Sequence, residues 1–213
     1  MGPNHRDSLS VFEQRFLSGK PQLHPILNAL AGMLLCMWDF YDPLCANTII
    51  AWTFEYLTTA CIEPDIERLP LVRGTQRFSW FVRRRTGMAI AFAVGIFTKS
   101  TQIDMMEYIQ AVPDMDFWTC LTNDILSSVS FFFVLPLRFI LKPHFFARFH
   151  KEELAGETVN YVHTRAYIEN KAPLQVLAEM AEELRVSRNT IHKALSHSPR
   201  ALRSWKIFER GYV

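Results

Sequence analysis

The feature that most limits the fold of this chain is the spacing of its apolar residues. Ile26, Leu30, Met33, Leu34 and Met37 follow one another at steps of three and four, which is the period of a helix with one apolar face. Glycine and proline, which interrupt helices, account for only 8 and 11 of the 213 residues. The pattern therefore predicts an all-α protein.

Proline-rich and glycine-containing segments mark the ends of the expected helices. Two helices, 79–97 and 114–126, are apolar on nearly every side, which is typical of buried helices. A later amphipathic helix is expected from Leu174 to Leu195, with a turn at Ser187–Asn189. An earlier helix is expected from Ala46 to Cys61.

Residues 128–148 break the helical pattern. They hold consecutive phenylalanines and two prolines but no apolar stripe. The segment is too short and too interrupted for a membrane span, which needs about 20 mostly apolar residues. We therefore expect no stable membrane insertion, although attachment at a membrane interface is an alternative use of these phenylalanines.

Net charge, cysteine spacing and the N-terminal sequence argue against a nucleic-acid-binding, a disulfide-stabilised or a secreted protein. The formal net charge of +2 gives no electrostatic footprint for nucleic acid, although Val186–Ile191 resembles the turn of a helix-turn-helix. The four cysteines lie in apolar segments without C-x-x-C spacing, so we expect buried, reduced thiols: Cys36, Cys45, Cys61 and Cys120. The polar N-terminus lacks the apolar stretch of a secretory signal. We expect a cytoplasmic protein that binds no nucleic acid.

One candidate metal motif begins at Asn123-Asp124-Ile125-Leu126-Ser127. Oxygen donors at positions i, i+4 and i+8 of a helix face one direction, because each step of four rotates by only about 40 degrees. Such hard oxygen ligands suit magnesium. Position i+8 is Phe131, which cannot bind a metal, so helix capping by Asn123 and Asp124 is the alternative.

Excising residues 128–148 repairs this motif. Glu152 then falls at position i+8 from Asn123, with Lys151 directly before it. We interpret 128–148 as an insertion, such as a translated, unspliced intron.

A second motif, Phe81-Val82-Arg83-Arg84-Arg85-Thr86-Gly87, lies upstream. A guanidinium grips phosphate oxygens with two parallel hydrogen bonds and keeps its charge when desolvated. A basic helix end in solvent is the alternative, above all for Arg84 and Arg85.

Together these segments resemble trichodiene synthase and its fungal relatives, which are class I terpene cyclases. The likeness covers roughly residues 12–165, with further landmarks at Pro43–Cys45, Phe54–Tyr56 and Cys61–Glu63. It implies a class I helical bundle in which three Mg²⁺ ions and an isoprenyl diphosphate meet. The implied metal ligands are Asn123, Ser127 and Glu152, the implied diphosphate ligands are Arg83 and Lys151, and Gly87 would turn a carbonyl toward substrate beside the linker Thr86.

The resemblance also implies parts that this sequence does not contain. The family's D-D-x-x-D/E motif would precede Phe12, and its R-R-Y motif would follow Val213. We interpret 1–213 as a single partial domain, incomplete at both ends. Asp39–Asp42 leads into a proline and is read as a helix end rather than a substitute metal site.

The implied activity is that of a carbon–oxygen lyase acting on phosphates. Farnesyl diphosphate would be ionised and cyclised to a sesquiterpene, and aromatic residues such as Phe54, Phe117 and Trp118 would exclude water, although such residues more often form core. A homodimer is compatible with the family. The chain as written is expected to be inactive or severely impaired, and a helical pseudoenzyme that binds an isoprenoid or a protein partner is the alternative.

Overall fold

The chain folds into helices. The computed structural model describes residues 3–66, 68–132 and 161–212, and it describes side chains for 6–66, 68–126 and 161–212. Every regular element within these residues is a helix, which confirms the all-α prediction. The longer elements are α1 (Pro3–Ser10), α2 (Phe12–Leu17), α3 (Pro25–Leu35), α4 (Met37–Phe40), α5 (Pro43–Ile66), α6 (Gln76–Thr86), α7 (Ala89–Gly95), α8 (Val112–Phe132), α10 (Tyr161–Glu169), α11 (Pro173–Ala194) and α12 (Pro199–Tyr212).

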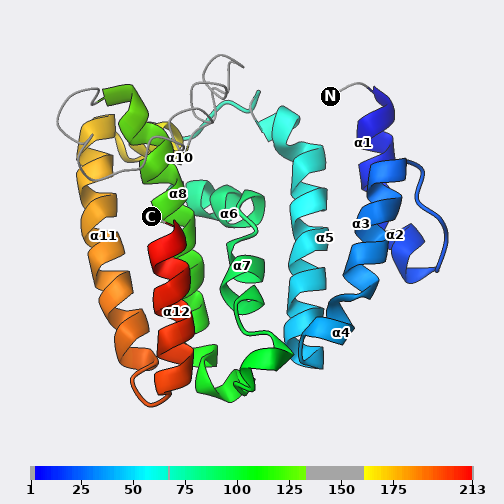
Figure 1. Cartoon of the computed structure of the whole chain (residues 1–213). Helices are drawn as coiled ribbons and strands as arrows, with labels where there is room; N and C mark the ends of the chain where they lie inside the picture. The colour runs from blue at the N-terminus through cyan, green and yellow to red at the C-terminus, as the bar shows by residue number, and fades with distance from the viewer. Residues whose placement is uncertain (1–2, 67, 133–160, 213) are drawn as a thin grey trace.

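Two groups of helices flank a short central pair (Figure 1). On one side α5 packs against α1, α2 and α4, and on the other side α8 packs against α11. Between them lie α6 and α7, each of which contacts both α5 and α8. Three single-turn 3₁₀ helices (Lys99–Thr101, Met105–Glu107 and Ile109–Ala111) connect α7 to α8.

Three apolar clusters hold this arrangement. The largest joins α5, α7, α8, α11 and α12, and at its centre Trp205 is fully buried against Trp118, with ring centroids 5.3 Å apart. A second cluster packs Phe12 and Leu34 against Leu57 of α5. The third packs Leu121 of α8 against α10 and α11. Since burial of large apolar side chains is the main favourable term in folding, these clusters hold the helices around α6 in place.

The structure corrects several predicted boundaries. The expected helix 79–97 is two helices, and the expected helix 46–61 is longer, because α5 continues through Pro64 into its last turn. α11 shows no turn at Ser187–Asn189, since the Ser187 hydroxyl donates to the carbonyl of Asp114 (2.9 Å) inside the α8 contact. That continuous helix removes the helix-turn-helix alternative. α8 runs to Phe132 and so includes the first residues of segment 128–148, whose remainder lies outside the described residues.

The predicted stripe on α3 is partly wrong. Leu34 is buried, but Ile26 and Met33 are 71% and 61% exposed. Leu27, which was not part of the stripe, is buried instead. Within the described residues, α3 packs the side that carries Leu27 and Leu34 against Phe12 and Leu57. The side that carries Ile26 and Met33 is left uncovered.

Within the described part of the chain, no helix is long and apolar enough to cross a membrane.

The cysteine prediction is confirmed for Cys45, Cys61 and Cys120, which are free and buried, but it is wrong for Cys36, which is free and exposed at the end of α3. Burial raises the pKa of the Cys120 thiol to about 12 and that of Cys45 to about 11. Their reactive thiolate forms are therefore scarce at neutral pH.

This burial pattern predicts that one thiol of the native chain reacts quickly with a disulfide reagent at pH 8. Cys36→Ser should remove the fast phase, while unfolding in guanidinium should make the remaining thiols reactive. Absorbance of the released chromophore measures both. Two or more fast thiols in the native chain would contradict the described packing.

Candidate functional site

The last turn of α6 carries three consecutive arginines, and each is held by a different carboxylate. Arg83 pairs with Asp124 and Arg84 pairs with Asp116, both on α8, whereas Arg85 pairs with Glu55 on α5. Cations at a helix C-terminus also interact favourably with the helix dipole. The turn is thus tied to both flanking helices. A basic helix end in solvent does not describe Arg83, whose side chain is 10% exposed, but Arg84 and Arg85 keep 44% and 33% of their side chains exposed to solvent.

Arg83 is the most enclosed of the three. Its side chain is 10% exposed and that of Asp124 is 13% exposed, with Nε of Arg83 donating to Oδ2 of Asp124 at 2.6 Å. One Nη of Arg83 also donates to the carbonyl of Cys120 at 3.2 Å. Charge-assisted hydrogen bonds of this kind are short and strong, so α8 holds the guanidinium at two points.

The pKa values of this pair reflect opposing effects. Burial raises the pKa of Asp124 to about 6, while the charge and hydrogen bond of Arg83 act in the opposite direction. Burial also disfavours the charge of Arg83, but Asp124 outweighs it and the pKa of Arg83 is raised. Both groups are therefore ionised at neutral pH, and Arg83 presents a permanent positive charge.

Arg84 and Arg85 are further fixed by aromatic rings. The guanidinium of Arg84 lies over the ring of Trp52, 4.8 Å from its centroid, while Asp116 is 3% exposed beneath it. The guanidinium of Arg85 lies 4.2 Å from the centroid of Phe81. Cation–π contacts of this type add to the ion pairs. They leave Arg83 as the arginine of this turn that faces the cavity described below.

The helix break predicted around Gly87 is present. α6 ends at Thr86, Met88 has a left-handed backbone (φ 49), and α7 begins at Ala89. A β-carbon at Gly87 would lie 2.7 Å from Nη1 of Arg83 and 3.1 Å from Sγ of Cys120. Any larger residue here would therefore displace the Arg83 guanidinium or Cys120 of α8.

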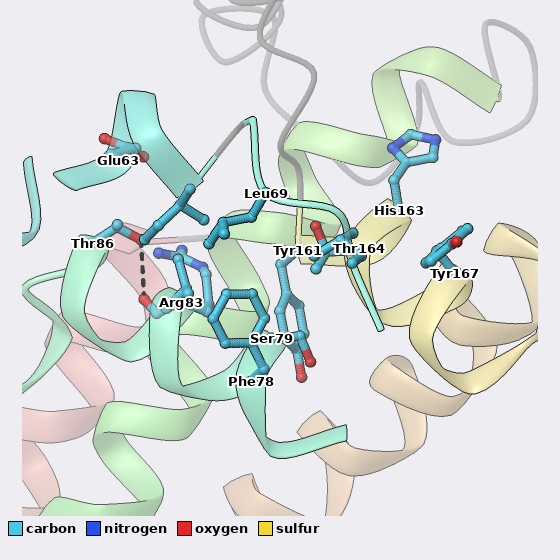
Figure 2. A pocket seen from close by; sticks show the side chains of 13 residues that line it. Glu63, Leu69, Phe78, Ser79, Arg83, Thr86, Tyr161, His163, Thr164 and Tyr167 are labelled. Carbon is cyan, nitrogen blue, oxygen red and sulfur yellow. Dashed lines mark hydrogen bonds between the residues drawn. The ribbon is translucent and has the colours of Figure 1, made fainter. Parts of the chain in front are cut away.

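A cavity of about 290 Å³ lies beside Arg83, between α6, the end of α5, the segment around Leu69–Leu71, and α10. Figure 2 shows its walls, with Phe78, Ser79, Arg83 and Thr86 contributed by α6 and Tyr161, His163, Thr164 and Tyr167 by α10. Glu63 lines the α5 end. The walls combine apolar side chains and hydroxyls with the buried guanidinium of Arg83, the carboxylate of Glu63 and the imidazole of His163. A ligand that has both an anionic and an apolar part would therefore place its anion at Arg83 and away from Glu63.

The structure places only some of the predicted ligands. Asn123 is exposed on α8, next in sequence to the Asp124 that holds Arg83. Ser127 follows one turn later on α8, but its side chain, like Lys151 and Glu152, lies outside the described residues. Among the described side chains no cluster of three His, Cys, Asp or Glu could hold a metal. The amide and hydroxyl oxygens of Asn123 and Ser127 are ligands of the type that magnesium accepts, so this part of the motif fits the ion.

The remaining candidate residues lie away from the cavity beside Arg83. Asp42 accepts from the backbone of Leu44 (2.9 Å) at the start of α5, so Asp39–Asp42 joins two helices as expected. The three aromatic candidates do not line the described cavity: Phe54 packs on Phe16, Phe117 on Trp80, and Trp118 on Trp205.

The carboxylates that neutralise the arginine turn were not predicted as site residues. Asp116 and Asp124 are charges within an otherwise apolar helix, and buried carboxylates require a paired cation. That mismatch, considered together with the three consecutive arginines in the last turn of α6, is the signal that could have identified them.

The close approach at Gly87 predicts that Gly87→Ala destabilises the protein by about 1–3 kcal/mol, because the guanidinium or Cys120 must move. Gly32→Ala is the matched control, since a β-carbon there meets nothing within 4 Å and alanine favours a helix by about 0.5–1 kcal/mol. Urea unfolding measures both. Equal stability of the two variants would contradict the contact.

Comparison with known proteins agrees with this geometry. The family model described as trichodiene synthase (TRI5) matches residues 3–133, a range that includes α6 and the Asn123 segment. Terpene synthase BipA of Cochliobolus sativus is 30% identical over 211 residues, which cover 97% of this chain and 58% of that protein. Monoterpene synthase 25 of Postia placenta is 30% identical over 210 residues, covering 97% and 57%. Longiborneol synthase CLM1 of Gibberella zeae is 28% identical over 217 residues, covering 97% and 56%.

The chain thus spans a little over half the length of these relatives. The family match nevertheless extends over more than half of this chain and includes both segments that meet at Arg83 and Asp124. On these grounds the chain belongs to the trichodiene synthase family of fungal terpene synthases.

Proposed function

We propose that this chain is part of a class I terpene cyclase that ionises farnesyl diphosphate and cyclises it to a sesquiterpene. The observation that carries the proposal is the meeting of Arg83 with the Asn123–Ser127 segment beside a helix break at Gly87. These are the segments whose resemblance to the family implies diphosphate and magnesium ligands. Relatives named as terpene synthases support the reaction class.

In the proposed reaction the bond between the allylic carbon and the diphosphate oxygen breaks, and its electron pair leaves with diphosphate. Arg83 would stabilise the developing negative charge, because its donors are fixed before the reaction begins. Lys151 would add a second positive charge. The resulting carbocation would cyclise and lose a proton, so the products are a sesquiterpene and diphosphate.

Asn123, Ser127 and Glu152 would hold Mg²⁺, with three ions expected in a complete enzyme. Bound magnesium would supply electrophilic assistance to the departing diphosphate. Apolar walls such as those formed by Leu69, Phe78 and Val82 would keep water from the reactive end of the substrate.

A non-catalytic role for this particular polypeptide is the second candidate. α8 remains helical through Phe132, so Phe131 occupies the position two turns after Asn123 where the motif needs a carboxylate. The family match ends at residue 133, inside segment 128–148, which agrees with an insertion there. We propose that the chain as written binds diphosphate but does not turn over substrate.

The diphosphate site is tested by titrating the 213-residue chain with inorganic diphosphate in a calorimeter. Arg83→Gln should weaken binding by about 10- to 100-fold, as expected for loss of a charged hydrogen bond. Arg84→Gln is the matched control, since it breaks a neighbouring ion pair to a buried carboxylate but leaves the cavity unchanged. Equal binding by wild type and Arg83→Gln, with both shown to be helical by circular dichroism, would sink the proposed role of Arg83.

The insertion predicts that deleting residues 128–148 restores the metal motif. In the deletion variant, Mg²⁺ should strengthen diphosphate binding by about tenfold or more relative to the parent chain, which corresponds to about 1.4 kcal/mol. Replacing Glu152 by glutamine in the deletion variant should abolish that gain. If the deletion variant is folded and shows no magnesium-dependent gain, the insertion hypothesis is wrong.

A further inference from the structure

Asp124 lies next to a proposed metal ligand, but it is turned toward Arg83. We infer that Asp124 is a positioning residue, which holds the side edge of the Arg83 guanidinium so that its end edge faces the diphosphate. The inference rests on the proposed function of Arg83 and assigns a role to a residue that the metal motif leaves without one.

The hydrogen bonds of Arg83 occupy one of the two edges of its guanidinium. A guanidinium carries five N–H donors in a rigid fork, of which the side edge is formed by Nε and one Nη. In Arg83 this edge is occupied, because Nε donates to Asp124 at 2.6 Å and Nη2 donates to the Cys120 carbonyl at 3.2 Å. Of the end edge, Nη1 lies 2.7 Å from the position that a β-carbon of Gly87 would occupy, and glycine leaves that position open.

Both acceptors belong to one rigid element. Cys120 and Asp124 are four residues apart on α8, so they lie one above the other at a spacing that the helix sets. A carbonyl has two lone pairs, so Cys120 can accept from Arg83 as well as from its own helix. The guanidinium plane is therefore fixed relative to the axis of α8, which also carries Asn123.

The helix break at Gly87 limits rotation of the guanidinium on its other side. Nη1 of Arg83 and Sγ of Cys120 lie 2.7 Å and 3.1 Å from the position that a β-carbon of Gly87 would occupy, so the guanidinium has little room to rotate toward the break. Arg83 lines the cavity despite being only 10% exposed. A ligand in the cavity would thus meet terminal nitrogens that are already oriented, which reduces the ordering cost of binding.

If Asp124 acted only through its negative charge, its effect on diphosphate binding would be the opposite of that expected for a positioning residue. A carboxylate beside an anion-binding arginine repels the anion, so removing its charge should strengthen anion binding. A positioning role predicts weaker binding instead, because the freed guanidinium loses its orientation. The sign of the change therefore separates the two explanations.

α8 supplies a matched comparison. Asp116 pairs with Arg84 at 2.9 Å, is more buried than Asp124, and is also on α8, but neither partner lines the cavity beside Arg83. Asp116→Asn should cost folding stability as Asp124→Asn does. It should leave the orientation of Arg83 unchanged.

The test measures inorganic diphosphate affinity by calorimetry and thermal unfolding by circular dichroism for the 213-residue chain. We expect both asparagine variants to unfold at lower temperature, Asp124→Asn to bind diphosphate about tenfold more weakly, and Asp116→Asn to bind within about twofold of wild type. In an Arg83→Gln background, Asp124→Asn should cause no further loss, because a residue that acts through Arg83 has nothing left to position.

Unchanged or tighter binding by Asp124→Asn, while Arg83→Gln still loses affinity, would overturn the positioning role but leave the proposed diphosphate site standing. If Arg83→Gln binds as wild type does, the proposed site fails and the inference fails with it. Should Asp124→Asn not fold, Asp124→Glu keeps the charge and displaces the guanidinium, so weaker binding by that variant supports the inference and wild-type binding overturns it.

Discussion

The arrangement depends on how the last turn of α6 is anchored. Of the three adjacent positive charges, that of Arg83 is buried and needs a partner, since an unpaired buried charge is strongly destabilising, whereas Arg84 and Arg85 remain partly exposed. Asp124 and Asp116 of α8 and Glu55 of α5 supply those partners. Breaking a buried pair by removing one member costs about 3–5 kcal/mol. That range applies to Arg83 and Asp124, which are both buried, and not to Arg85 and Glu55, whose side chains are 33% and 45% exposed. The ion pairs thus set the position of α6, and α6 sets the position of the cavity.

The helix break directly after the arginines decides where the anchored Arg83 side chain lies. Because α6 stops at Thr86 and Met88 takes a left-handed conformation, the chain turns away directly after the arginines. The guanidinium of Arg83 therefore lies at the end of a helix, beside an open backbone at Gly87, and not within a continuous helical surface. The family match covers residues 3–133, a range that contains Arg83, Gly87 and Asp124.

Periodicity predicted the fold class because apolar spacing of three and four leaves few alternatives to helix. It failed where packing overrides the pattern: α11 continues through Ser187 because that hydroxyl bonds to α8, and Ile26 and Met33 face outward although their spacing fits a buried stripe. Arg83 and Gly87 could be predicted from a motif. The carboxylate partner of Arg83 could not, because an ion pair between residues 83 and 124 has no local signature in sequence, and the same holds for the pairs of Arg84 with Asp116 and of Arg85 with Glu55.

The central claim is that Arg83 and the start of the α8 motif form one diphosphate site. A crystal structure of the chain grown with MgCl₂ and inorganic diphosphate tests it most directly. We expect diphosphate oxygens within hydrogen-bonding distance of the terminal nitrogens of Arg83, with Asp124 still bound to Nε and the anion on the side of α8 that carries Asn123. Diphosphate bound away from Arg83, or bound to Arg83 only after the Asp124 contact has been broken, would contradict it.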